Sequence, residues 1–185
     1  MSKHSHDLGA MPRLTQLVLE HDAELNKPAN FPGKKFYVAD SLDSLGDEVN
    51  SILSSFNLGL KTFRYFRLPR GKFKAAEPHS DSAANDCFAL NLVLRGSLIV
   101  HFYDVPTTDT VIDIGPGGVR FPILKNTTVK PTESVYHQTQ RIRLIDTKTI
   151  HSADTSESIE DLLLISFIPI PQYSFELASR ILNNG

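Results

Sequence analysis

The sequence predicts a mainly β protein, a barrel or a sandwich, with supporting helices towards both ends of the chain. From residue 61 onward, at least seven short runs are rich in Val, Ile, Leu, Phe and Tyr, the residues that favour strands. Clusters of Gly, Pro, Asp, Ser and Thr separate these runs, and no helical pattern interrupts them. Helical periodicity is confined to residues before 60 and after 171.

The length fits one domain. The chain has 185 residues, within the usual size of about 100 to 200, so we expect a single domain over residues 1–185. Within it, residues 1–58 are expected to form a helical N-terminal support, residues 60–170 the β core, and residues 172–183 a C-terminal helix.

Charge and cysteine content exclude several classes of protein. A net charge of -2 gives no general attraction to nucleic acid or to an anionic membrane. No apolar run approaches the roughly 18 residues of a membrane span, and the first residues lack the apolar stretch of a secretory signal. The single cysteine, Cys87, excludes an internal disulfide and a cysteine-based zinc site. These features predict a cytoplasmic protein.

Three segments have the spacing of amphipathic helices. The first covers residues 12–25. The second begins at Asp40 or Ser41, either of which can cap it, and ends at Gly59. The third covers residues 172–183. The apolar residues that line one face of each are Leu14, Leu17, Val18 and Leu25, then Leu42, Leu45, Val49, Ile52, Leu53 and Phe56, then Phe175, Ala178, Ile181 and Leu182.

The expected strands follow one another through the middle of the chain. They cover residues 61–68, 87–96, 97–104, 110–114, 118–123, 141–147 and 161–170. Loops are expected at 26–33 and 131–140, with His137 exposed in the latter, and turns at 115–118 and 152–158.

His79, Asp81 and His151 form a candidate metal site. His79 and Asp81 are two residues apart, so in an extended segment both side chains project to the same side. His151 follows the strand at 141–147, where a neighbouring strand brings it across the barrel mouth. Two imidazoles and a carboxylate on one face leave the other positions of an Fe(II) ion open. The alternative is a surface turn in which Asp81 and Asn85 bond only to nearby backbone groups.

The entry to this site resembles that of prolyl-hydroxylase-like 2-oxoglutarate oxygenases. Their pattern is a strand with a Tyr, a Pro-Gly-type turn, a short extended segment and His-x-Asp. Tyr65, Pro69, Gly71, His79 and Asp81 fall in these positions.

The second half of the resemblance is the unit around His151. In the family, the distal histidine follows one strand and precedes another apolar strand, and residues 141–169 look like that unit. The resemblance covers about residues 60–170 and implies a double-stranded β-helix, a jelly-roll or cupin-like barrel.

The resemblance also implies an activity. Fe(II) would be held by the catalytic residues His79, Asp81 and His151, with 2-oxoglutarate as co-substrate and dioxygen as oxidant. The expected reaction is hydroxylation of a C–H bond in a peptide side chain or a small metabolite, with release of succinate and CO2. Neither the identity of this prime substrate nor an oligomeric state is predicted.

One part of the family pattern is missing. The family places an Arg or Lys about ten residues after the distal histidine to bind the far carboxylate of 2-oxoglutarate, but residues 158–165 contain no base. Arg95 is the expected replacement, because Jumonji-type and asparaginyl-hydroxylase-like members carry a Lys-Gly pair on the strand after His-x-Asp that resembles Arg95–Gly96. Alternatively, Arg95 ends its strand at the surface or pairs with Asp104. Arg141 and Arg143 are further candidates for binding this carboxylate.

Asn91 and Tyr65 are candidates for further hydrogen bonds to the oxoacid. Strand alternation places Asn91 on the same side as Arg95. The alternative for Tyr65 is a core aromatic residue with a satisfied hydroxyl.

Two other functions remain open. Residues 95–122 resemble a cupin in having a Gly-containing turn, paired strands and a proline-rich bend, so the chain is alternatively a metal-dependent isomerase or a small-molecule binding module. It lacks the clustered His-x-His and following Glu of a typical cupin site. A barrel that has lost activity and serves as an interaction domain is the third hypothesis. His101 is an alternative ligand, while His4 and Asp7 lie in a terminus expected to be mobile.

Overall fold

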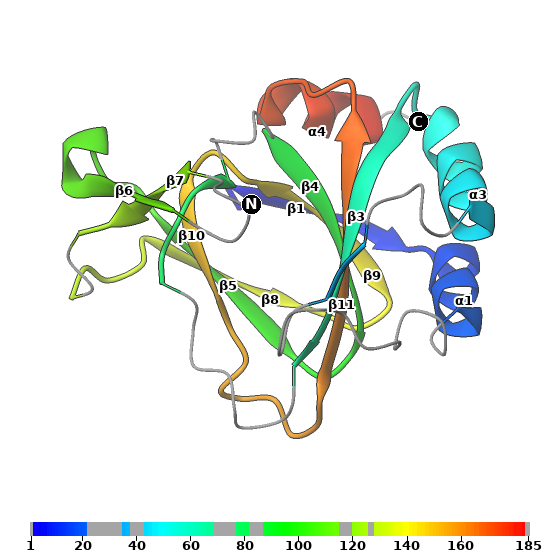
Figure 1. Cartoon of the computed structure of the whole chain (residues 1–185), viewed down its shortest axis with the longest axis horizontal. Coiled ribbons are helices and arrows are strands. Elements are labelled where there is room, and N and C mark those ends of the chain that lie inside the picture. Colours follow the sequence, from blue (N-terminus) through cyan, green and yellow to red (C-terminus); the bar gives the residue numbers. More distant parts are fainter. Residues whose placement is uncertain are drawn as a thin grey trace.

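The computed structural model describes residues 2–21, 35–37, 43–68, 77–81, 87–114, 120–125 and 128–183. Figure 1 shows a body of two β-sheets that face each other, with helices against one of them. The predicted loop at 26–33, the turn at 69–71 and the glycine-rich turn at 115–118 lie outside the described residues.

The larger sheet contains six strands in the order β1-β9-β4-β11-β3-β2, and every neighbouring pair is antiparallel. Its strands are β1 (Ser5–Ala10), β9 (Arg141–Asp146), β4 (Phe88–Arg95), β11 (Leu162–Ile170), β3 (Gly59–Leu68) and β2 (Lys35–Tyr37). Neighbours in this sheet come from distant parts of the sequence, so the sheet brings both ends of the chain together.

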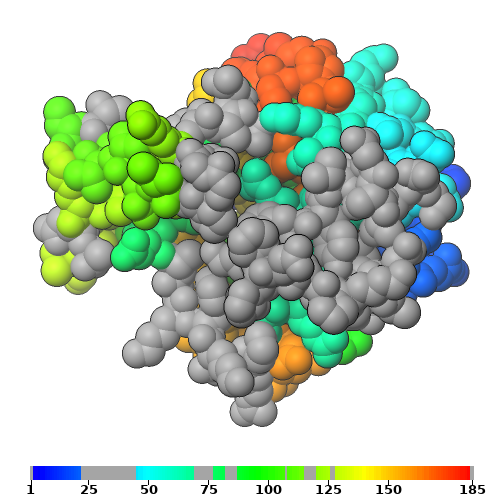
Figure 2. Space-filling model, in the orientation of Figure 1, coloured from blue at the N-terminus to red at the C-terminus, as the bar shows by residue number. Residues whose placement is uncertain are grey.

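The smaller sheet contains three antiparallel strands in the order β10-β5-β8. They are β5 (Leu98–Tyr103), β8 (Glu133–His137) and β10 (Ile150–Asp154). A 3-10 helix (Thr107–Asp109) leads into a separate hairpin of β6 (Thr110–Ile114) and β7 (Arg120–Leu124), which projects from the body at the left of Figure 2.

Side chains alternate between the two faces of the larger sheet. On β4, Leu90 and Leu92 belong to a core beneath the helices, whereas Val93 packs against residues of the smaller sheet such as Val100 and Phe102. This alternation follows from the two-residue period of a strand. The inner face of the larger sheet therefore lines the interior between the sheets, and its outer face supports the helices.

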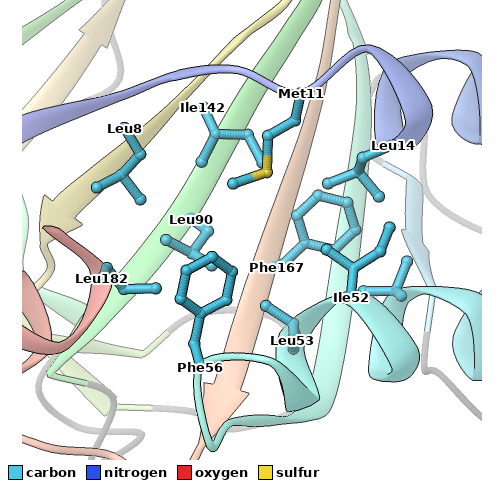
Figure 3. A pocket seen from close by; sticks show the side chains of 11 residues that line it. Leu8, Met11, Leu14, Ile52, Leu53, Phe56, Leu90, Ile142, Phe167 and Leu182 are labelled. Atoms are coloured by element: carbon cyan, nitrogen blue, oxygen red, sulfur yellow. The ribbon is translucent and has the colours of Figure 1, made fainter. Parts of the chain in front are cut away.

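In the part of the chain that the structure describes, three helices cover the outer face. They are α1 (Pro12–Glu20), α3 (Asp43–Ser54) and α4 (Phe175–Asn183), and all three contribute to one hydrophobic core with the sheet. Figure 3 shows a small pocket in this core, where Phe56 and Leu182 approach Leu90, Ile142 and Phe167 from the helical side. Every lining side chain is apolar, so this pocket is a packing feature of the core.

The predicted helices are confirmed in position, with shifted ends. The first is shorter than expected within the described residues, and the second ends at Ser54 rather than at Gly59. Asn57 adopts the positive φ (56°) of the turn that follows, and Gly59 already begins β3.

The expected strands are found, and four further strands were missed. The N-terminal residues 1–58 are not purely helical, because β1 and β2 join the larger sheet. The expectation of a mobile terminus at His4 and Asp7 is wrong, since Asp7 pairs with Arg143 of β9. The segment 131–140, predicted as a loop, contains β8.

Within the described part of the chain, no helix is long and apolar enough to cross a membrane.

Candidate metal site

His79 and His151 are joined through their main chains. They form an isolated antiparallel bridge in which the amide of His79 donates to the carbonyl of His151 at 2.9 Å, and the reverse bond is 2.8 Å. His151 follows β9, as the sequence suggested, and itself lies within β10, where it is paired with Phe102 of β5. The two imidazole rings have centroids 5.0 Å apart. Two histidines far apart in sequence are therefore fixed side by side.

Asp81 is held in place by the same kind of contact. Its amide donates to the carbonyl of Thr147 at 2.9 Å, and the amide of Ser80 donates to Pro122 at 3.0 Å. Its carboxylate Oδ1 lies 3.9 Å from Nε2 of His79. The segment with His79 and Asp81 is thus fastened to β7, to β10 and to the residue that follows β9.

Both histidine rings have their Nδ1 atoms next to main-chain carbonyls. Nδ1 of His79 lies 2.8 Å from the carbonyl oxygen of Glu77, and Nδ1 of His151 lies 2.9 Å from that of Thr149. A carbonyl oxygen only accepts, so each Nδ1 carries the proton and the lone pair of the neutral ring is on Nε2. This arrangement orients a metal-binding histidine in many proteins.

Aromatic rings and one cation surround the three side chains. Phe121 contacts His79 edge-on with ring centroids 5.9 Å apart, and Phe102 lies 6.3 Å from the ring of His151. The guanidinium of Arg64 lies 3.5 Å from Oδ2 of Asp81. Arg64 balances the negative charge of the carboxylate.

Among the described residues, no three His, Cys, Asp or Glu side chains converge closely enough to hold an ion in the conformation of this structure. The carboxylate of Asp81 faces Arg64 as well as His79. The donor types, two imidazoles and one carboxylate, are those of an Fe(II) site with open positions, but in this conformation they do not converge on one point. The structure therefore brings His79 close to Asp81 and to His151, and their role as ligands of one ion stays a prediction.

The structure does not bring Arg95 to this site. Arg95 is exposed at the last residue of β4, whereas Cys87, just before β4, accepts a hydrogen bond from Thr147 beside Asp81. Seven residues separate Arg95 from Phe88, about 23 Å along a strand. The adjoining turn contacts the acidic segment instead, because the amide of Gly96 donates to Glu160. Arg95 thus ends its strand at the surface.

Tyr65 is also directed elsewhere. It is fully buried in the core beneath the helices, on the face of β3 opposite to Arg64. The alternative expected for this residue, a core aromatic, agrees with this position.

Asn91 and Arg143 do face the interior. They are directly paired between β4 and β9, on the face of the sheet that carries Val93 and Ile145. Arg141, two residues earlier on β9, donates from Nε to Asp7 at 2.9 Å and is more exposed.

Sequence reasoning missed the position of His137. It was expected in an exposed loop, but it lies on β8 and is only 1% exposed. The alternation of Val135 and His137 with exposed Ser134 and Tyr136 was the available signal.

The other histidines considered as metal ligands, His101 and His4, have hydrogen-bond or ion-pair partners elsewhere. His101 points away from the interior, with Nδ1 2.7 Å from Ser134 Oγ and Nε2 3.5 Å from Asp154. The buried ring of His4 lies 3.0 Å from Asp104 and 3.3 Å from Asp146. Neither ring belongs to the group around His79.

No protein-family model matches the sequence, and no curated protein matches it. Solved structures resemble its fold. The "non-heme alpha ketoglutarate dependent epimerase SnoN from nogalamycin biosynthesis" superimposes with a TM-score of 0.58 at 11% identity, over 90% of this chain and 78% of that one. AviO1 from Streptomyces viridochromogenes Tue57 has a TM-score of 0.51 at 8% identity, over 92% and 91% of the two chains. The chain has the double-stranded β-helix, cupin-like fold that its sequence predicted.

Proposed function

We propose that this protein is an Fe(II)- and 2-oxoglutarate-dependent dioxygenase whose metal ligands are His79, Asp81 and His151. The observation that carries the proposal is the reciprocal main-chain bridge that fixes the two histidine rings 5.0 Å apart, with the carboxylate of Asp81 beside one of them. SnoN, which shares the fold, is itself described as alpha ketoglutarate dependent, and a second SnoN structure is a complex with Fe3+ and alpha ketoglutarate. These likenesses support the proposal.

The residues of the chain have separate tasks in this function. When bound, iron, 2-oxoglutarate and dioxygen supply the oxidising chemistry that hydroxylates a C–H bond and releases succinate and CO2. The main-chain bonds of His79, Asp81 and His151 set the positions of the ligands, and the carbonyls of Glu77 and Thr149 fix the protons of both rings on Nδ1. Phe121 packs beside the ring of His79 and Phe102 beside the ring of His151.

The prime substrate is a small metabolite or a peptide side chain, since the side chains of His79 and Asp81 are only partly buried. A reducing compartment such as the cytoplasm suits both Fe(II) and the lone thiol of Cys87.

Metal binding tests the proposal directly. Anaerobic calorimetric titration of the full chain with Fe(II) should show one site, and subsequent 2-oxoglutarate should produce the weak visible charge-transfer band of the chelated iron. His79→Ala and His151→Ala should each lower metal affinity at least 100-fold, since each removes one of three ligands.

His101→Ala is the matched control. This histidine lies on β5, opposite Ser152 of β10 and so next to His151, but its ring contacts Ser134 and Asp154. It should bind metal as the wild type does. A wild-type chain that binds Fe(II) no better than His79→Ala would falsify the proposal.

A metal-dependent isomerase is the second candidate. The observation that favours it is the position of Arg95, which leaves the sequence-predicted cation far from the metal ligands. An isomerase of this kind binds metal but shows neither the charge-transfer band nor succinate formation when 2-oxoglutarate is added, and these two measurements separate the candidates.

A further inference from the structure

The carboxylate of Asp81 lies between a ring nitrogen and a guanidinium. Nε2 of His79 is 3.9 Å from Oδ1, and Nη1 of Arg64 is 3.5 Å from Oδ2. Either oxygen of an ionised carboxylate can accept a hydrogen bond from a cation or bind a metal ion. One oxygen of Asp81 thus faces a candidate ligand, while the other faces a positive charge that an arginine does not lose.

Arg64 reaches this carboxylate from the larger sheet. On β3 it shares a face with Phe66 and Leu68, both of which pack in the core between the sheets. The side chain of Arg64 is 27% exposed and that of Asp81 is 24% exposed. Opposite charges that are mostly withdrawn from water attract each other more strongly, and are screened less by salt, than a pair on the open surface. This ion pair therefore restrains the side chain of Asp81.

The ion pair affects whether the candidate ligands can converge. Hydrogen bonds fix the main chains of His79, Asp81 and His151, so only rotation of the side chains can bring their donor atoms together. Among the described residues, no such group of donor atoms converges in this conformation. The guanidinium attracts one oxygen of the carboxylate, and a divalent ion bound to Asp81 would be repelled by the positive charge of Arg64. A metal ion has to overcome both effects.

Divalent ions differ in how much they need this carboxylate. Imidazole nitrogen suits Ni(II), Cu(II) and Zn(II), whereas Mn(II) and Mg(II) depend on oxygen ligands. The rings of His79 and His151 have centroids 5.0 Å apart, and in both of them the Nδ1 atom faces a main-chain carbonyl oxygen, which leaves the lone pair on Nε2. An ion that prefers nitrogen can use these rings without Asp81, but an ion that prefers oxygen needs the carboxylate.

We propose that Arg64 competes with divalent ions for the carboxylate of Asp81 and is thereby a specificity-determining residue of the candidate metal site. The inference rests on the proposed function, since it takes His79, Asp81 and His151 as the ligands. Ions that depend on oxygen ligands have to displace the guanidinium before they bind, whereas ions that prefer imidazole do not. Arg64 therefore weakens the binding of Mn(II) more than that of Ni(II).

Calorimetric titration of the full chain with Mn(II) and with Ni(II) tests the competition without turnover. Arg64→Gln, which removes the charge and keeps a polar side chain, should bind Mn(II) about tenfold more tightly than the wild type and Ni(II) less than about threefold more tightly. Arg64→Lys, which keeps the charge, should gain less Mn(II) affinity than Arg64→Gln. An unchanged or lower Mn(II) affinity in Arg64→Gln overturns the proposal, as does an equal gain for both ions.

Arg67→Gln is the matched control, because Arg67 lies on the same strand but its Nε is 3.9 Å from Asp161, in a pair whose side chains are 46% and 41% exposed. Its loss should change the affinity for either ion less than about twofold. In Asp81→Ala, the additional substitution Arg64→Gln should no longer favour Mn(II), since the carboxylate for which the cations compete is gone. A gain in Arg67→Gln as large as in Arg64→Gln would overturn the proposal.

Nitrogen NMR of the arginine side chains gives a second readout on the wild-type chain. Mg(II), which is diamagnetic and depends on oxygen ligands, should at saturation shift the guanidinium signals of Arg64 and leave those of Arg67 unchanged. Unchanged Arg64 signals overturn the proposal. If all chains bind metal but Mn(II) affinity does not depend on Arg64, this inference alone fails. If the wild type binds none of these ions and Arg64→Gln binds Mn(II), the proposed function fails and the competition stands.

Discussion

Among the described residues, His137 has the largest shift in pKa. Burial lowers its pKa from 6.5 to about 3, the charge of Arg143 adds to this effect, and Asp7 opposes it. Between these two pH values the unfolded chain binds a proton that the folded chain does not. The free energy of unfolding should therefore fall as the pH falls below about 6.5, by about 1.4 kcal/mol per pH unit from this residue.

Urea unfolding between pH 7 and pH 4.5 measures this slope. His137→Phe should flatten it, since the variant has no titrating group at this position. Asp7 acts in a separate window. Burial raises the pKa of Asp7, but hydrogen bonds from Arg141 and Gly9 outweigh this and hold the pKa below 3.8, so its stabilising contribution is lost only under more acidic conditions. An unchanged slope in His137→Phe would contradict the buried neutral ring.

Gly96 is required both by its backbone conformation and by the lack of space for a side chain. Gly9 has the first of these constraints without the second, so a comparison of the two separates them. The φ of Gly96 is +78°, and a Cβ there would lie 2.9 Å from the carbonyl oxygen of Asp161 and from Oγ of Ser158. Gly9 has a φ of +94° with nothing within 4 Å. Gly9→Ala should cost the backbone strain alone, about 1–2 kcal/mol. Gly96→Ala should lower the free energy of unfolding, measured by urea unfolding, clearly more than Gly9→Ala does. Equal losses would show that the turn between β4 and β5 rearranges to make room for the methyl group.

Single residues also show how far sequence reasoning reaches. The closeness of His79 to Asp81 and to His151 was predictable because a two-residue spacing and the order of elements decide it, whereas their role as metal ligands stays a prediction. The positions of Arg95 and Tyr65 were not, because they depend on strand register and on which end of β4 meets the ligands. A one-residue change of phase reverses the face of every side chain in a strand.

At the level of elements, β1 protects an edge of the larger sheet. It pairs with β9 and supplies Ser5 and Asp7 to Arg143. Removal of residues 1–10 should expose β9 as an edge strand and leave Arg143 without a counter-ion, a change that costs about 3 kcal/mol or more.

Thermal unfolding and light scattering test the truncation, with removal of residues 1–3 as control. That shorter truncation deletes the exposed Lys3–Asp104 pair, which contributes less than about 1 kcal/mol, and keeps β1. Equal stability of the two truncated chains would mean that β1 contributes nothing to the sheet.

The missed elements share a physical cause. β8 and β10 have only five residues each and carry histidines, serines or aspartate at positions that a pattern search assigns to turns. Both are held by pairing with β5, which lies between them. Short strands like these are specified by their partners more than by their own propensity.

In the whole molecule, the larger sheet separates two hydrophobic cores. One lies beneath the helices and contains Phe167, whose ring is 6.4 Å from that of Phe63, and the other lies between the sheets. Phe167→Ala should lower the free energy of unfolding by about 3–5 kcal/mol. It should leave metal affinity unchanged, because the proposed ligands His79, Asp81 and His151 do not belong to this core.

Denaturant melts and metal titration of the same variant check this separation. Ile112→Ala, at a side chain 60% exposed on the β6–β7 hairpin, should change stability by less than about 0.5 kcal/mol. A loss of metal affinity in Phe167→Ala would show that the two cores are coupled.

The architecture as a whole was the most predictable level. Runs of strand-forming residues separated by turns leave few alternatives to a two-sheet barrel, and the helical faces require a sheet to cover. The strand order was not predictable, since β1 inserts beside β9 through contacts that no local pattern encodes.

The main-chain pairing of His79 with His151 has a consequence for engineering. The hydrogen bonds between these two residues come from their main chains, so their side chains can be replaced without loss of the pairing. Carboxylate or thiolate side chains placed at either position would make the proposed coordination sphere harder or softer while the main-chain pairing stays intact. The same barrel could thereby be retuned towards manganese or copper by altering one side chain at a time.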